Sequence, residues 1–189
     1  GGTYRMMTQV LSNHGLQFDF VDTTDIQNIK KAIKKNTKWV FVETPTNPML
    51  EITDIAAVSE LCKKHNLLFA VDNTFMSSYG QRPLEYGADC VMHSSTKFIG
   101  GHSDVLGGVL VAKDKELADR LHFIQKSGGA IPSPFDAWLL LSSVKTMSMR
   151  VQKASDNAMV ISKYFETQKL IVKTIYPGLP TQPQNQNGK

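Results

Sequence analysis

The chain has 189 residues, of which 41% are apolar, so it can bury the core of one domain and reach into a second. Its net charge of +4 comes from 21 basic and 17 acidic residues spread along the sequence, which argues against a nucleic-acid partner. No apolar run is long enough to cross a membrane, and the first residues do not resemble a signal peptide, so we expect a cytoplasmic protein. The two cysteines, Cys62 and Cys90, lie in apolar stretches without metal-ligand spacing, which predicts buried free thiols and no metal site.

Strand-like and helix-like segments alternate in the first part of the chain. Residues 17–21, in which Phe18 and Phe20 would share one face, predict a strand, and a helix is expected over residues 24–35. Residues 38–43 predict the next strand, which two prolines end shortly afterwards. This alternation is typical of an α/β sheet.

The middle of the chain continues the same pattern. Either Thr53 or Asp54 can cap a helix with one apolar face, and residues 67–72 predict a strand directly after it. Further short strands are expected at residues 90–93 and 107–112. Because these runs are almost continuously apolar, they predict a mostly parallel sheet that helices cover on both faces.

The last part of the chain is mainly helical. Helices are expected after Asp114, from Pro134 and over residues 151–165. Residues 170–176 predict a last strand, and residues 181–189 form a polar tail that cannot pack a core.

Polar residues with suitable chemistry follow these apolar runs. Asn47, Asp72 and Lys97 each come after a predicted strand, and ligands of open α/β sheets bind beyond the carboxyl ends of the strands. A pyridoxal phosphate (PLP) site needs a lysine for a Schiff base, a carboxylate beside the pyridine nitrogen and hydroxyl groups near the phosphate. Lys97 and Asp72 offer the first two, and the nearby Ser94 and Thr96 offer the hydroxyls.

Each of these residues also has a simpler interpretation. Asp72 can cap the turn after its strand, and Lys97 on its own can be a surface lysine. Ser94 and Thr96 can each make ordinary turn hydrogen bonds, and Asn47 can stabilise the turn before Pro48. It is the combination in one chain that favours a cofactor site.

Five segments match one known family in order along the chain: residues 1–5, 43–48, 71–75, 94–104 and 176–180. With them, the chain resembles the cysteine/methionine-metabolism (transsulfuration) family of PLP-dependent enzymes. That family includes cystathionine γ-lyase, cystathionine γ-synthase, cystathionine β-lyase and methionine γ-lyase.

The resemblance implies an α/β fold, the fold-type-I (aspartate-aminotransferase-like) large domain. Residues 1–150 would be this PLP-binding domain, incomplete at its N-terminus. Residues 151–180 would be a long helix and a strand leading to a missing C-terminal domain, since the chain spans about half of a family member. The full-length protein would be a homo-oligomer, a dimer or tetramer.

The resemblance also implies roles for individual residues. Lys97 would be the catalytic Schiff-base lysine, and Asp72 would interact with the pyridinium nitrogen. Ser94 and Thr96 would contact the phosphate, and Asn47 would contact the phenolic oxygen. Thr74 would lie near the cofactor, and Arg5 would bind the substrate.

The expected activity is that of a carbon–sulfur lyase that converts cystathionine by γ-elimination to cysteine, ammonia and 2-oxobutanoate. The alternatives are a cystathionine γ-synthase or β-lyase, or a non-catalytic truncated fragment that keeps the fold and pairs with full-length subunits. A nucleotide-binding domain is not favoured, because neither a Gly-x-Gly-x-x-Gly nor a Walker-type loop is present.

Overall fold

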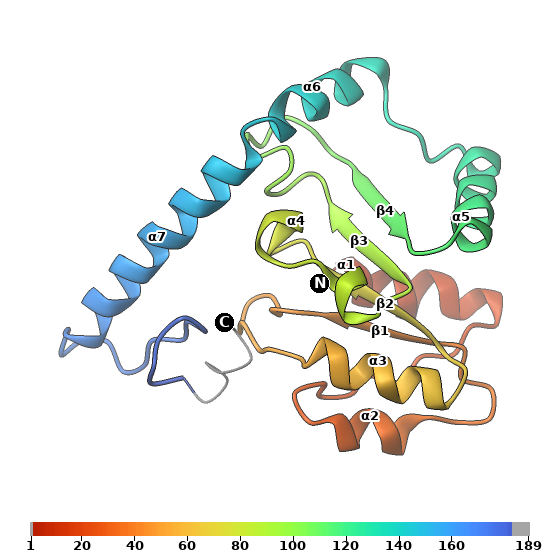
Figure 1. Cartoon of the computed structure of the whole chain (residues 1–189), viewed down its shortest axis with the longest axis horizontal. Helices are drawn as coiled ribbons and strands as arrows, with labels where there is room; N and C mark the ends of the chain where they lie inside the picture. The colour runs from red at the N-terminus through yellow and green to blue at the C-terminus, as the bar shows by residue number, and fades with distance from the viewer. Residues whose placement is uncertain (1, 183–189) are drawn as a thin grey trace.

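The computed structural model describes residues 2–182, and its centre is a four-stranded sheet with the order β1-β2-β3-β4 (Figure 1). The strands are β1 (Trp39–Glu43), β2 (Leu68–Asp72), β3 (Cys90–Ser94) and β4 (Gly108–Ala112). β1, β2 and β3 are parallel, whereas β4 runs antiparallel to β3. The carboxyl ends of the parallel strands therefore share one edge of the sheet, where ligands of α/β proteins usually bind.

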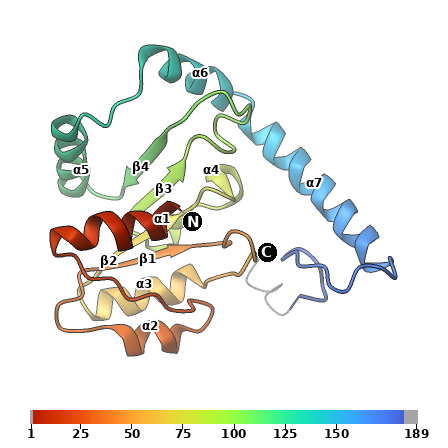
Figure 2. The ribbon, with the colours of Figure 1, turned by 180° about the vertical axis from the view of Figure 1, so that it is seen from behind.

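Helical segments precede the sheet, connect its parallel strands and follow it in the chain. They are α1 (Gly2–Arg5), η1 (Met6–Val10), η2 (Leu11–His14), α2 (Ile26–Ala32), α3 (Ile55–Lys64), α4 (Ser77–Gly80), η3 (Pro83–Tyr86), α5 (Lys115–Gly128), α6 (Pro134–Val144) and α7 (Met147–Glu166). α3 packs against β2, α5 packs against β4, and α4 packs against α7. Figures 1 and 2 show α7 as a long rod that extends away from the sheet.

The core helix α3 forms as its sequence predicts. The Asp54 side chain accepts a hydrogen bond from the Ala57 N–H at 2.9 Å and so caps the helix. One face of α3 is buried against the sheet through Val58 and Cys62. The main core cluster contains these residues and Ile29, Val42, Ile55, Leu61, Leu67, Phe69, Val71 and Ala88.

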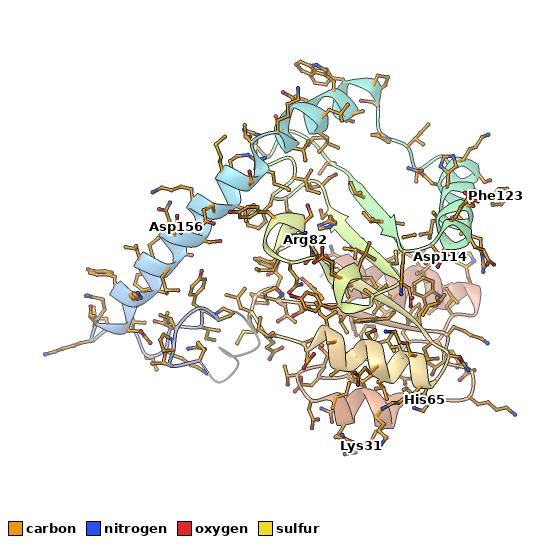
Figure 3. The ribbon with its side chains drawn as sticks, in the orientation of Figure 1. Lys31, His65, Arg82, Asp114, Phe123 and Asp156 are labelled. Carbon is orange, nitrogen blue, oxygen red and sulfur yellow. The ribbon has the colours of Figure 1, made fainter. Side chains whose placement is uncertain are left out.

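The helices of the last part also begin near the residues expected. Asp114, labelled in Figure 3, accepts a hydrogen bond from the Leu117 N–H at 2.8 Å at the start of α5. Pro134 is the first residue of α6, where a proline costs no hydrogen bond. α7 begins at Met147, one turn earlier than expected, and α2 is shorter than residues 24–35.

Both cysteines are buried free thiols, as expected. Burial raises the pKa of the Cys62 thiol to about 11, and the nearby charge of Asp89 adds to this shift. None of the helices within residues 2–182 is long and apolar enough to cross a membrane.

The strand expected at residues 17–21 is wrong. The segment lies outside the sheet and is held by side-chain contacts: Lys34 Nζ forms an ion pair with Asp19 at 2.7 Å, and Phe20 contacts Tyr4 with ring centroids 4.9 Å apart. Alternating apolar residues give a strand only where a neighbouring strand accepts their backbone hydrogen bonds.

The strand expected at residues 170–176 is also wrong, for the same reason. Leu170 and Val172 are almost completely exposed, and Thr174 uses its carbonyl oxygen to accept from Gln182 Nε2 at 2.9 Å. The polar tail lies within the described residues only at positions 181 and 182.

The sheet is mostly parallel, but β4 departs from the expected arrangement. β4 is antiparallel, and four of its five residues are exposed rather than covered on both faces. An apolar run shows that a strand is suited to burial, but it does not encode the strand's direction.

Candidate active site

The candidate site lies at the shared edge formed by the ends of β2 and β3. β2 ends at Asp72 and β3 ends at Ser94, and the two strands are paired in parallel. Lys97 follows shortly after β3 in a turn. The fold thus brings together three of the residues that the sequence singled out, Asp72, Ser94 and Lys97.

Thr74 links the ends of the two strands through hydrogen bonds. Its hydroxyl donates to Asp72 Oδ1 at 2.6 Å, and its backbone N–H donates to the same oxygen at 3.0 Å. The Thr74 hydroxyl in turn accepts a hydrogen bond from the Ser94 N–H at 2.8 Å. Both bonds to the Asp72 carboxylate end on Oδ1, so within residues 2–182 Oδ2 stays available to a further donor. This Asp72–Thr74–Ser94 chain fixes the buried carboxylate relative to β3.

Two further ionisable residues, Glu43 and His93, lie near Asp72 and were not predicted as site residues from the sequence. Glu43 is paired with Asp72 across β1 and β2, and its pKa is raised by burial and by the Asp72 charge. Burial lowers the pKa of His93, although Asp72 acts in the opposite direction. Glu43 ends its strand as Asp72 does, which is the signal that could have identified it. Two carboxylates at adjacent strand ends favour a positively charged partner beside Asp72.

The segment that carries Lys97 is a tight turn. The Lys97 N–H donates to Ser94 O at 3.1 Å, the Gly100 N–H donates to Ser95 O at 2.8 Å, and the Gly101 N–H donates to Lys97 O at 2.6 Å. Lys97 is exposed, and its amine makes no hydrogen bond or ion pair to the residues described. A ligand could therefore contact this amine without breaking a described hydrogen bond.

The two expected phosphate contacts differ in their availability. Ser94 is half-buried at the end of β3, and its hydroxyl has no hydrogen-bond partner among residues 2–182. The Thr96 hydroxyl instead donates to Gly107 O at 3.3 Å and accepts from the Gly107 N–H at 3.0 Å. A hydroxyl has one proton to donate, so Thr96 would have to rotate its O–H to donate to a phosphate.

Asn47 and Arg5 lie on other segments. Asn47 is exposed in the loop after β1, between the cis peptide bonds Thr44–Pro45 and Asn47–Pro48, and its backbone bonds to the Glu43 carboxylate. This contact ties the Asn47 loop to the same sheet edge. Arg5 is exposed at the end of α1, and no described hydrogen bond or ion pair joins it to Asp72 or Lys97.

The set of donors and acceptors at the sheet edge fits PLP. Lys97 provides a free primary amine, Asp72 provides a carboxylate oxygen without a donor, and Ser94 provides a free hydroxyl. These groups suit the aldehyde, the ring nitrogen and the phosphate of that cofactor. The residues present can therefore hold it.

Comparison with known proteins shows the family of the chain. The family described as "Cys/Met metabolism PLP-dependent enzyme" matches residues 1–189. A probable cystathionine gamma-synthase of Herpetosiphon aurantiacus is 48% identical over 185 residues, which cover 98% of this chain and 58% of the relative. The cystathionine gamma-lyase of Bacillus subtilis (strain 168) is 45% identical over 189 residues, covering all of this chain and 50% of the relative.

A solved structure shows the same fold. The crystal structure of cystathionine gamma-lyase from Lactobacillus plantarum complexed with L-serine matches with a TM-score of 0.97 and 42% identity, covering 99% of this chain and 49% of that one. The chain thus spans about half the length of the relatives it matches. Because the match extends over the whole chain, this protein belongs to the Cys/Met metabolism family of PLP-dependent enzymes, and its α/β fold is that of the transsulfuration enzymes.

Proposed function

We propose that this chain is the cofactor-binding part of a carbon–sulfur lyase that converts cystathionine to cysteine, ammonia and 2-oxobutanoate by γ-elimination. The observation that carries the proposal is the hydrogen-bonded chain Asp72–Thr74–Ser94 beside the free amine of Lys97. The family match supports PLP as the cofactor.

Each residue of the site has a proposed task toward the cofactor. Lys97 would hold PLP covalently, and Asp72 Oδ2 would accept from the protonated ring nitrogen. Ser94 and Thr96 would contact the phosphate, Asn47 would donate to the phenolic oxygen, and Thr74 would hold Asp72 in place. Arg5 would bind the substrate.

When bound, PLP supplies an electron sink for negative charge at the substrate α-carbon. Lys97 Nζ, released when the substrate amine takes its place, would act as a base and remove the α-proton. The same amine could then return a proton on the way to loss of the sulfur group from the γ-carbon. Thr74, which donates to Asp72 Oδ1, would hold the Asp72 carboxylate beside the ring nitrogen.

A cystathionine γ-synthase is a second candidate, favoured by the relative of that name at 48% identity. A β-lyase uses the same residues but breaks the bond at the β-carbon. With cystathionine, the whole protein would release 2-oxobutanoate if it is a γ-lyase and pyruvate if it is a β-lyase. A γ-synthase would instead join cysteine to an activated homoserine ester.

A non-catalytic role, in which this chain keeps the fold and pairs with full-length subunits, is the alternative proposal. The whole protein would be a homo-oligomer. The two buried free thiols suit a reducing compartment, so we place it in the cytoplasm.

Covalent capture of PLP tests the cofactor site. The purified chain is incubated with PLP, reduced with borohydride and mapped by peptide mass spectrometry. We expect the label on Lys97, with the variant Lys97→Ala losing it and the exposed control Lys153→Ala keeping it. A label spread over surface lysines, or label unchanged in Lys97→Ala, would contradict the proposal for this chain.

A further inference from the structure

Arg150 on α7 binds the segment that directly follows Lys97. Its Nη1 donates to Phe98 O at 2.7 Å, and its Nη2 donates to Ile99 O at 3.1 Å. The same Nη2 donates to Ser143 O at 2.7 Å, and Nε donates to Thr146 Oγ1 at 3.1 Å. One guanidinium group thus connects the start of α7, the end of α6 and the turn after Lys97.

The turn is shaped to receive this guanidinium group. Gly101 has φ +74°, and a Cβ atom there would overlap the Arg150 side chain. The turn is closed from inside by the bonds of the Gly100 and Gly101 N–H groups to Ser95 O and Lys97 O. Arg150 therefore holds from outside a loop in which one of the internal bonds is made to the Lys97 carbonyl oxygen.

α7 also contacts the other side of the site. The Tyr79 hydroxyl on α4 donates to Gln152 Oε1 on α7 at 3.0 Å. α4 follows closely after Asp72 and Thr74, and it packs against α7. The same turn of α7 thus reaches both segments that build the site.

We propose that Arg150 is a positioning residue for Lys97, which fixes the Lys97 backbone relative to the Asp72–Thr74–Ser94 chain. This role rests on the proposed function of Lys97. A planar guanidinium can donate to several carbonyl oxygens at once, whereas a lysine offers a single flexible ammonium group. Without Arg150, the turn at residues 98–101 would lose its outer support, and Lys97 would sample more positions.

The variant Arg150→Ala tests this inference through two readouts. The first readout is the hydrogen-exchange rate of the Gly100 and Gly101 amides in the cofactor-free chain. The second is the PLP concentration at which borohydride reduction labels half of Lys97. Because Arg150→Ala loses hydrogen bonds from a charged group, we expect the two amides to exchange about tenfold faster than in wild type. We also expect half-labelling of Lys97 to need about tenfold more PLP. Arg150→Lys should lie between Arg150→Ala and wild type. Methylguanidinium added at millimolar concentration should restore capture in Arg150→Ala.

The matched control is Lys153→Gln, which removes a positive charge from an exposed position on the same helix. It should change neither readout. Gly101→Ala places a methyl group where the guanidinium lies, so it should reproduce the Arg150→Ala result without removing the arginine. If Arg150→Ala does not fold, Arg150→Lys and Gly101→Ala carry the test.

The inference is overturned if Arg150→Ala exchanges and captures PLP as wild type does. It is also overturned if exchange rises equally at core amides such as that of Val71, because Arg150 would then only stabilise the fold. If even the wild type captures no PLP on Lys97, the proposed function of this chain fails, and exchange at Gly100 and Gly101 alone decides whether Arg150 holds the turn.

Discussion

The hydroxyl group of Thr74 joins the carboxyl ends of two paired strands, β2 and β3. It donates to Asp72 Oδ1 and accepts from the Ser94 N–H, so one small group satisfies a carboxylate and a backbone amide. Ser and Thr hydroxyls can make both kinds of bond at once. The Thr74 side chain therefore helps to orient the Asp72 carboxylate relative to β3, together with the Thr74 backbone N–H.

Thr74→Val keeps the shape of the side chain but removes both hydroxyl bonds. It leaves the Ser94 N–H without its partner, so we expect the free energy of unfolding to fall by about 1–3 kcal/mol. Urea denaturation measures this change. Thr74→Ser keeps the hydroxyl and should lose less stability; a loss in Thr74→Ser with none in Thr74→Val would show that the methyl group, not the hydroxyl, matters.

Glu43 should make stability depend on pH. Burial and the Asp72 charge raise its pKa, so the folded chain keeps this proton at pH values where the unfolded chain has lost it. The folded state then binds more protons, and the free energy of unfolding falls as pH rises from about 4 through the raised pKa.

Glu43→Gln removes this titration and should be more stable than wild type near neutral pH, with the difference disappearing in acid. Unfolding followed by circular dichroism across this pH range measures it. Glu60→Gln, on an exposed face of α3, is the control. Parallel pH curves for wild type and Glu43→Gln would contradict the prediction.

Residues at strand ends were predictable from the sequence, whereas contacts between distant segments were not. Asp72 and Ser94 each close an apolar run, so their meeting at one edge followed from the parallel order. Arg150 donates mainly to backbone carbonyl oxygens of a segment far from it in sequence, and such acceptors leave no side-chain motif. The use of the Thr96 hydroxyl by Gly107 was hidden for the same reason.

At the scale of elements, the strands of the core were predicted because burial dictates their composition. β2 is buried at four of its five positions, and its sequence is correspondingly an apolar run. The segments at residues 17–21 and 170–176 also contain apolar residues typical of strands, but neither of them pairs with a strand in the described part of the chain. Composition identifies a segment suited to a sheet, while pairing depends on the rest of the fold.

The start of α3 gives a prediction at this scale. Asp54→Ala removes the acceptor for the Ala57 N–H, and loss of such a cap costs about 1 kcal/mol of stability. Urea denaturation should show this loss. Asp54→Asn keeps an oxygen at the same position and should stay close to wild type; if both variants lost stability equally, the charge rather than the cap would be responsible.

The whole molecule exposes large apolar side chains on several elements. Figure 3 labels Phe123 on α5, which is 70% exposed, and Trp138 and Leu141 on α6 are 61% and 67% exposed. Apolar surface on this scale marks contact sites or favours aggregation. It fits a chain that spans about half the length of its relatives.

We expect the chain on its own to self-associate through these faces. Leu141→Glu combined with Phe123→Glu should lower light scattering at a given concentration and reduce binding of a hydrophobic dye, because charge replaces exposed apolar surface. Lys153→Gln combined with Lys126→Gln lowers the net charge by the same amount at exposed, charged positions and is the control. Equal improvement in both pairs would attribute the effect to net charge.

The reversal of direction between β3 and β4 determines what the intervening residues can do. Ser94 pairs with Gly108, so the chain leaves the sheet and re-enters it at the same edge. A connection to a parallel strand would have had to cross to the opposite end of the sheet. Residues 95–107 are thus a closed loop anchored twice at one edge of the sheet, and a change in its length would move Lys97 without altering the register of any strand.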